Sequence, residues 1–392
     1  LQPMPVRRTT YPQAGPAVLE RAAALLCNSK CPLVLVGNGV IRRQASGHGA
    51  ADALVDLVHR LNLPVVHTYM GKGCIDYRDP HALGTVGLER GGADHAAVPQ
   101  LEEADLVVTV GYDLVEWSPA LWNPRRDKEI LHIDSTPAEI DGHYLPALEV
   151  VGEIGYALHT LAGLCQAQEH AWWKPGEPGA DKVAQEGRGE EAAMSGLRGY
   201  AADDSIPMKP QRVIWDLRQS MADDDILVSD VGAHKLWLAL LYPTTRPNTV
   251  IISNGFATMG IAVPGGLAAK LAFPERKVVA VSGDGGFLMN SQELETARRL
   301  RLPYVNVVWT DRRYGVIELN QQRRFGRTFG VEFTNPDLVQ YAHSFGIPAW
   351  RVEQADDFAP MLRRAMDMDT PTLIEVPIDH TENMKLGTAA GG

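Results

Sequence analysis

Short apolar runs alternate with amphipathic stretches along the first half of the chain. Residues 32–36, 64–68, 106–110 and 129–134 are short runs rich in Val, Leu and Ile, and residues 49–61 show the spacing of an amphipathic helix. Runs that are apolar at nearly every position are typical of strands buried on both faces of a parallel sheet. The first half therefore predicts an α/β domain with a doubly wound parallel sheet.

The second half repeats this pattern. Residues 226–230, 277–281 and 304–309 form apolar runs, and each is followed within a few residues by a turn containing Gly or Asp. The stretches between these runs are long enough for helical crossovers, which parallel strands require. We therefore expect the fold class to be α/β, with two domains that each hold a doubly wound parallel sheet.

A polar stretch rich in Gly and Glu separates the two halves and reads as an interdomain linker. From these changes in composition we predict four segments. They are a linker remnant at 1–14, a central α/β domain at 15–165, a linker at 166–204 and a cofactor-binding domain at 205–387.

Composition narrows the class of protein. The chain has 392 residues, 45% of them hydrophobic, which is enough for sizeable cores. A net charge of -11 argues against nucleic acid as a partner, because phosphate contacts need a basic surface. The four cysteines show no zinc-like pairing, and neither a signal peptide nor an apolar run of about 20 residues is present. We expect a cytoplasmic protein that does not enter a membrane.

Two carboxylates follow two of the predicted strands in the second half. Asp284 lies in a Gly-Asp-Gly turn, and Asp311 comes directly after the next apolar run. Ligands of parallel α/β sheets bind at the carboxyl ends of the strands, where glycines and helix amino termini favour a phosphate. Mg²⁺ prefers oxygen ligands and often bridges carboxylates to phosphates. We interpret this pair as a metal–diphosphate site, although an isolated Gly-Asp-Gly is also typical of an ordinary turn.

This arrangement resembles the diphosphate-binding motif of the thiamine diphosphate enzymes. The resemblance extends over nearly the whole chain, including residues 290–297 and 330–333, and it is greatest to the catabolic, FAD-independent acetolactate synthases. It implies that Mg²⁺ is bound by Asp284, Asp311 and the backbone carbonyl of Arg313. The pair Thr310-Asp311 departs from the Asn-Asn that is commoner in the family.

The resemblance also implies the residues that hold thiamine diphosphate. Met259 would support the bent form of the cofactor, and His234 would lie at its phosphate, although alone that histidine is also typical of a helix start. Val316 and Asn320 would lie near the substrate. The full set of implied cofactor-binding residues is Gly232, Ala233, His234, Ala257, Met259, Gly283, Asp284, Gly285, Gly286, Asp311 and Tyr314.

The same comparison implies what is missing. Residues 110–123 lack the Arg-rich stretch that marks FAD binding in biosynthetic synthases, so we expect no FAD. The glutamate that activates the cofactor normally lies in a preceding pyrimidine-binding domain, which we do not find in these 392 residues. We therefore leave the catalytic residue unknown and expect this chain to be N-terminally truncated and inactive alone.

The implied function is that of an acetolactate synthase, which decarboxylates pyruvate and joins the product to a second pyruvate, giving 2-acetolactate. A homo-oligomer, as a dimer or tetramer, is the expected assembly. Phe256 and Ala257 stand where catabolic relatives carry glutamines, and Asn320 stands where they carry a further glutamine near the acceptor. Two alternatives stay open. One is a different thiamine diphosphate-dependent 2-keto acid decarboxylase or lyase, and the other is a non-catalytic fragment that binds cofactor or forms oligomers.

Overall fold

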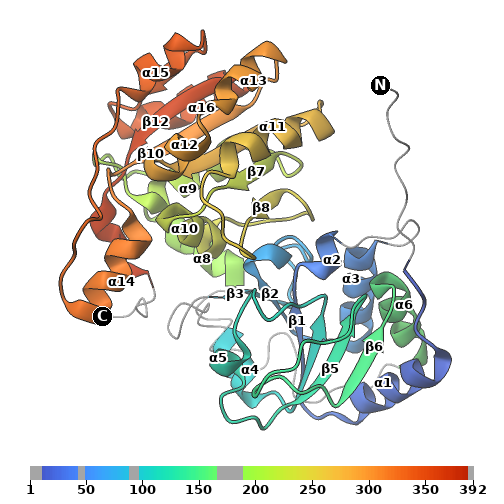
Figure 1. The fold of residues 1–392 in the computed structure, drawn as a ribbon. Coiled ribbons are helices and arrows are strands. Elements are labelled where there is room, and N and C mark those ends of the chain that lie inside the picture. The colour runs from blue at the N-terminus through green and yellow to red at the C-terminus, as the bar shows by residue number, and fades with distance from the viewer. Residues whose placement is uncertain (1–10, 43–48, 88–96, 166–188, 387–392) are drawn as a thin grey trace. The chain divides into compact units, whose positions relative to one another are not determined.

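The chain divides into two compact units, each built around a six-stranded sheet (Figure 1). Unit 1 comprises residues 1–189 with 245–248, and unit 2 comprises 190–244 with 249–392. The computed structural model describes residues 11–42, 49–87, 97–165 and 189–386. The predicted linker at 166–204 lies partly outside the described residues, and its described end includes the helix α8 (Gly189–Arg198). The domain boundaries drawn from composition stay predictions.

The sheet of unit 1 is entirely parallel, with the strand order β3-β2-β1-β4-β5-β6. Its strands are β1 (Pro32–Val36), β2 (Val65–Thr68), β3 (Ala82–Val86), β4 (Leu106–Val110), β5 (Glu129–Asp134) and β6 (Leu148–Val151). Its helices are α1 (Pro16–Asn28), α2 (Gly39–Arg42), α3 (Ala50–Leu61), α4 (Ala97–Glu103), α5 (Pro119–Trp122) and α6 (Ile154–Leu164), with the short η1 (Tyr69–Gly71).

Alternate residues of β1 explain why its sequence is apolar throughout. Val34 and Val36 pack into one core with residues of α1, α3 and α6, whereas Leu33 and Leu35 pack into the core on the opposite face. That second core includes Leu101 of α4. Because helices cover both faces of the sheet, the side chains on both faces of β1 must be apolar. The sequence of β1 is therefore a continuous apolar run and does not alternate with polar residues.

Unit 2 repeats this architecture with the parallel order β11-β12-β10-β9-β7-β8. Its strands are β7 (Ile226–Ser229), β8 (Val250–Ile252), β9 (Val278–Gly283), β10 (Val305–Thr310), β11 (Ala349–Arg351) and β12 (Thr372–Pro377). Besides α8, its helices are α9 (Pro210–Ser220), α10 (Ala233–Leu241), α11 (Ala262–Ala272), α12 (Asp284–Asn290), α13 (Glu293–Arg299), α14 (Gly315–Phe325), α15 (Leu338–Ser344), α16 (Phe358–Met366), η2 (Ala355–Asp357) and η3 (His380–Lys385).

The strands of unit 2 are also covered by helices. Ala262 and Ala269 of α11 join Val228 and Ala280 in one core, and α9 packs against α10 and α16. Two parallel sheets of this kind confirm the fold class that the hydrophobic pattern predicts.

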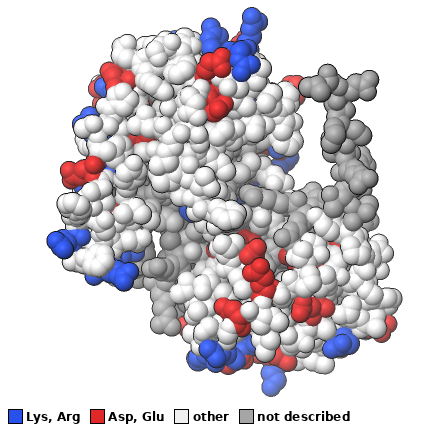
Figure 2. All heavy atoms as spheres, in the orientation of Figure 1, with Lys and Arg blue, Asp and Glu red and all other residues white. Residues whose placement is uncertain are grey.

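Charged side chains are spread over the surface. In Figure 2, Lys and Arg form small separate groups on the displayed face. No described helix combines the length and the apolar character that a membrane crossing needs.

Candidate active site

The order of strands in unit 2 places a crevice at the carboxyl ends of β7 and β9. The chain passes from β7 to β8 on one side and returns to β9 on the other, so the direction of winding reverses between these two strands. Such a switch point is where doubly wound sheets bind ligands. A cavity of about 390 Å³ lies here and is lined by residues that follow β7, β9 and β10. Its volume falls in the range of small-molecule sites.

The cavity brings together nearly all residues that the sequence singles out. Val316 also lines it, whereas Asn320 lies exposed further along α14 and is not among the lining residues. The sequence-predicted residues that line the cavity are Gly232, Ala233, His234, Ala257, Met259, Gly283, Asp284, Gly285, Gly286, Asp311, Arg313, Tyr314 and Val316.

Asp284 is held in place by hydrogen bonds at the first turn of α12. Its Oδ1 accepts the backbone N–H of Gly285 at 2.9 Å, and its Oδ2 accepts the N–H of Arg312 at 2.8 Å and Nδ2 of Asn335 at 2.7 Å. Burial nevertheless raises the pKa of Asp284 above its ordinary value. The carboxylate is therefore fixed, but it is poorly compensated by positive charge.

Asp311 adds a second carboxylate to the same cavity. Burial, followed by the negative charge of Asp284, raises the pKa of Asp311 to about 7. Its Oδ1 accepts a hydrogen bond from the backbone N–H of Arg313 at 3.0 Å. A buried carboxylate beside a partly buried one, whose ionisation its negative charge disfavours, is a fitting pair of ligands for a divalent cation.

The side chain of Arg313 offsets this negative charge only in part. Its guanidinium pairs with Glu318 at 2.6 Å and with Glu332 at 2.8 Å. Because the side chain is engaged there, the backbone carbonyl is the group of Arg313 that suits the predicted metal role.

His234 is buried at the amino end of α10 and lines the cavity. Burial lowers the pKa of His234 to about 4, so its ring is neutral near pH 7. Its Nε2 is buried and has no hydrogen-bond partner among the described residues. A buried polar atom without a partner is costly, and a ligand with a hydrogen-bonding group would satisfy it.

Asp230, which the sequence analysis did not single out, ties the end of β7 to the neighbouring turn. Its Oδ1 accepts the N–H of Val231 at 2.6 Å and of Gly260 at 2.8 Å, and its Oδ2 accepts the N–H of Ala262 at 3.0 Å. A Cβ atom added to Gly286 would lie 2.8 Å from Oδ1 of Asp230. Gly286 therefore allows α12 to approach this carboxylate closely.

The turn that Asp230 holds contains Ala257 and Met259. Ala257 has a left-handed backbone with φ of 47°, which is uncommon for a residue other than glycine. Both residues line the cavity. A left-handed residue at a cavity is often retained for the position of its backbone groups, as the predicted contact with the cofactor requires.

Lys235 is a further cavity residue that the sequence analysis missed. Its Nζ donates a hydrogen bond to Oδ1 of Asn254 at 2.7 Å, and burial lowers its pKa to about 8. Its position directly after the Gly-Ala-His turn was a usable signal, because a cation beside a predicted phosphate site is expected.

The donor set fits a diphosphate with a divalent cation. The first turns of α10, α12 and α14 all contribute to the lining, and helix amino termini favour anions. The unpartnered Nε2 of His234 and the carboxylates of Asp284 and Asp311 supply the remaining groups that such a ligand needs.

Two family models match the chain. Residues 19–161 match the central domain of thiamine pyrophosphate enzymes, and residues 230–376 match their C-terminal thiamine pyrophosphate-binding domain. The second match contains the cavity residues that follow β7, β9 and β10.

Curated relatives are similar over most of this chain. An acetolactate synthase of Bacillus subtilis is 35% identical over 98% of the chain and 65% of its own length. A catabolic acetolactate synthase of Raoultella terrigena is 38% identical over 76% of the chain and 52% of its own length. A probable acetolactate synthase large subunit of Methanococcus aeolicus is 30% identical over 95% and 62%, respectively. The chain thus spans less than two thirds of the length of these relatives.

Proposed function

The chain belongs to the thiamine pyrophosphate enzymes, and from this premise we propose that it forms the cofactor-binding part of an acetolactate synthase. The proposed reaction decarboxylates pyruvate and joins the product to a second pyruvate, giving 2-acetolactate. The observation that carries the proposal is the meeting of His234, Asp284 and Asp311 around one cavity at the switch point of unit 2.

The chain's own residues have distinct proposed roles in holding the cofactor. Asp284, Asp311 and the carbonyl of Arg313 hold Mg²⁺, and His234 hydrogen-bonds the diphosphate. When bound, thiamine diphosphate supplies a nucleophilic carbon and an electron sink. The left-handed turn at Ala257 orients the backbone groups that contact the pyrimidine ring. The remaining lining residues, Gly232, Ala233, Met259, Gly283, Gly285, Gly286 and Tyr314, shape the cavity and exclude water.

The proposed substrate contacts lie on α14. Val316 lines the cavity, which supports a place beside the substrate, whereas Asn320 lies outside that lining and would reach a substrate only at the mouth. Phe256, at a position where catabolic relatives carry a glutamine, is fully exposed at 101% and is not among the residues that line the cavity. A different acceptor 2-keto acid, or simple decarboxylation, is the second candidate that this departure favours.

The activating glutamate is proposed to come from outside this chain. Among the described residues, none of those that line the cavity is a glutamate. The relatives are longer than this chain, which leaves room for a further domain in the whole enzyme. We propose that the enzyme is a cytoplasmic homo-oligomer that binds neither nucleic acid nor membrane.

We also propose that unit 1 binds no FAD, because its own switch point is filled by protein. Between β1 and β4, both carboxylate oxygens of Glu116 accept the backbone N–H of Asn38, each at 3.0 Å, and Thr68 donates its hydroxyl to the same carboxylate. A Cβ added to Gly37 or Gly39 would lie 2.5 or 2.6 Å from the backbone of Gly111. These glycines thus serve close packing, and Glu116 takes the place that a phosphate would need.

The binding proposal is tested by calorimetric titration of the chain with thiamine diphosphate in the presence and absence of Mg²⁺. We expect Mg²⁺-dependent binding, and we expect Asp284→Ala and Asp311→Asn to abolish the dependence on Mg²⁺. Glu129→Gln, at the exposed start of β5 in unit 1, is the carboxylate control. Undiminished binding by the Asp284→Ala variant is incompatible with the assignment of the metal ligands.

The activity proposal is tested by product analysis with pyruvate, thiamine diphosphate and Mg²⁺. The isolated chain is expected to make little product, because losing a positioned proton donor typically costs on the order of 10²–10⁴-fold. Adding the N-terminal part of a longer relative is expected to restore acetolactate. Acetaldehyde as the main product would favour the decarboxylase, and robust turnover by the chain alone would place the catalytic machinery within these residues.

A further inference from the structure

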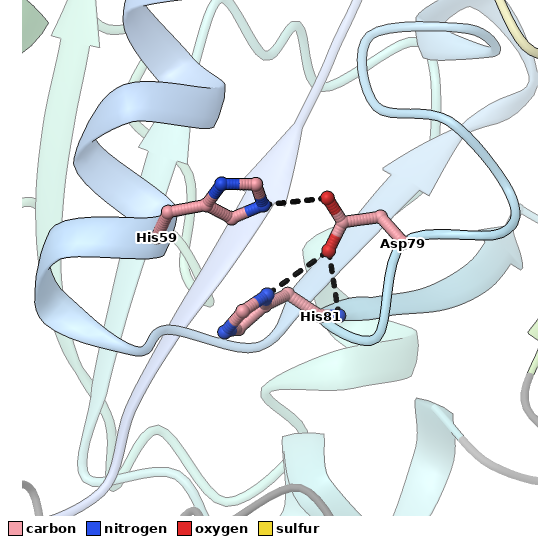
Figure 3. Close-up of side chains that lie close together, drawn as sticks. All are labelled: His59, Asp79 and His81. Atoms are coloured by element: carbon pink, nitrogen blue, oxygen red, sulfur yellow. Dashed lines mark hydrogen bonds and ion pairs between the residues drawn. The ribbon is translucent and has the colours of Figure 1, made fainter.

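Two histidines and an aspartate meet in unit 1, and none of them lines the cavity of unit 2. His59 lies in the last turn of α3, and Asp79 and His81 lie in the connection that leads into β3 (Figure 3). Nε2 of His59 lies 2.6 Å from Oδ2 of Asp79, and Nδ1 of His81 lies 2.9 Å from Oδ1. The potential ligand atoms of the three residues all lie within 4.8 Å of one another.

The surroundings hold the inner part of this cluster in place. Nε2 of His81 lies 3.0 Å from Oδ1 of Asn62, which caps α3 in a left-handed conformation with φ of 53°. The backbone N–H of His81 donates to Oδ1 of Asp79 at 2.9 Å. A metal-binding histidine almost always has its second ring nitrogen held by such a partner, which fixes the orientation of the ring.

The carboxylate of Asp79 lies between the two rings. Nδ1 of His81 faces Oδ1 of Asp79, and Nε2 of His59 faces Oδ2 of the same group. A proton on each of these nitrogens gives a hydrogen bond, and a metal ion can take the place of these protons.

We propose that His59, Asp79 and His81 form a binding site for a borderline divalent transition metal, of which Zn²⁺ is the best fit. Two imidazole nitrogens and one carboxylate oxygen are ligands that Zn²⁺ accepts at about 2.0–2.2 Å. The present nitrogen–oxygen contacts are hydrogen bonds, so the carboxylate moves back by about 1 Å or less when the metal takes the place of the protons. Hard cations such as Mg²⁺ prefer oxygen ligands and are disfavoured here.

The exposure of the three residues suits a site that opens to solvent. The side chains of Asp79 and His81 are each 11% exposed, whereas that of His59 is 50% exposed. Water can therefore complete the coordination from the side of His59. A bound metal would clamp the end of α3 to the connection before β3, and it would add stability to unit 1.

The test uses the whole purified chain, stripped of metal with a chelator and then titrated with Zn²⁺ in excess Mg²⁺. Excess Mg²⁺ is meant to occupy the carboxylates of unit 2. Competition with a chromophoric chelator measures the affinity for zinc. We expect one zinc ion per chain, and we expect the His59→Gln variant to bind it at least about tenfold more weakly, the lower end of the cost of losing even an outer partner of a metal ligand.

Glutamine at position 59 separates a metal ligand from a merely structural hydrogen bond. The glutamine amide can donate a hydrogen bond to Asp79 but is a poor zinc ligand. If His59 only forms a structural hydrogen bond with Asp79, the His59→Gln variant should therefore bind zinc as the unmodified chain does. His343→Gln, an exposed histidine of α15, and Cys27→Ser with Cys31→Ser are the controls and should bind as the unmodified chain does.

A second measurement does not depend on any variant. Crystals soaked in Zn²⁺ should show an anomalous peak within coordination distance of all three side chains. Three outcomes would each overturn the proposal. They are an absence of saturable zinc binding, equal zinc affinity in the His59→Gln variant, and loss of zinc binding in the cysteine variants.

Discussion

At the scale of single residues, the cavity depends on His234. Its ring is buried and neutral near pH 7, and its Nε2 has no partner among the described residues. A diphosphate oxygen near this atom would gain a hydrogen bond to a charged group, which typically contributes about 1.5–3 kcal/mol.

We expect His234→Ala to weaken the binding of Mg²⁺–thiamine diphosphate by roughly 10–100-fold, which corresponds to that free energy. Calorimetric titration measures the affinity. His343→Ala, on the surface of α15, is the control and should leave it unchanged. Equal affinity in the His234→Ala variant would show that the ring does not contact the cofactor.

Glu116 makes the stability of unit 1 depend on pH. Burial raises the pKa of Glu116 to about 7 against an ordinary value of 4.5, and the hydrogen bonds from Thr68 and Asn38 offset this only in part. Below pH 4.5 the carboxyl group is protonated in both the folded and the unfolded states, so its ionisation does not lower the free energy of unfolding. As pH rises towards 7, the unfolded state releases the proton first, and the folded state loses relative stability.

We therefore expect Glu116→Gln to flatten the decline in stability of unit 1 between about pH 5 and pH 8, by an amount on the order of 3 kcal/mol. Urea unfolding at the two pH values gives the difference in the free energy of unfolding. The exposed Glu129, at the start of β5, provides a matched Glu→Gln control. A variant that keeps the pH dependence of the unmodified chain would contradict this account.

At the scale of elements, the approach of α12 to the end of β7 positions the site. Gly286 lies on α12, and a Cβ there would lie 2.8 Å from Oδ1 and 3.1 Å from Cγ of Asp230. Asp230 cannot move aside cheaply, because three backbone N–H groups hold its carboxylate.

Gly286→Ala is expected to destabilise unit 2 by about 1–3 kcal/mol, the usual cost of overpacking. Thermal or urea unfolding measures the loss. Gly196 on the exposed side of α8 has no atom within 4 Å of an added Cβ, so Gly196→Ala should be neutral or stabilising by up to about 1 kcal/mol. Equal effects of the two substitutions would argue against a tight contact at Asp230.

At the scale of the whole molecule, each unit has its own hydrophobic core on its own sheet. The cavity belongs to unit 2, whereas Glu116 belongs to unit 1. A ligand stabilises the part of a protein that binds it, by about 2.7 kcal/mol at a concentration of 100 times Kd.

Calorimetric unfolding is therefore expected to show two transitions. Mg²⁺–thiamine diphosphate should raise the melting temperature of one of them, and Glu116→Gln should move the other. A single transition that shifts with both changes would mean that the units unfold together.

The hydrophobic pattern predicts some of the buried strands with their observed bounds and misses others. The apolar runs at 32–36, 106–110 and 129–134 are strands in the structure with those same bounds. The strands β3, β6, β8, β11 and β12 were not predicted. β3 and β11 contain Gly, Thr or Arg and gain stability mainly from pairing with a neighbouring strand, whereas β12 is buried and largely apolar and was missed all the same.

The sequence by itself determined the two α/β domains and the cofactor motif, because apolar runs and Gly-Asp-Gly are local patterns that need no partner to be recognised. Only the tertiary structure showed Glu116 filling the switch point of unit 1, and His59 within reach of Asp79 and His81. Such groups lie 20 to 78 positions from their partners. Their contacts follow from the order in which strands join a sheet, which no local pattern specifies.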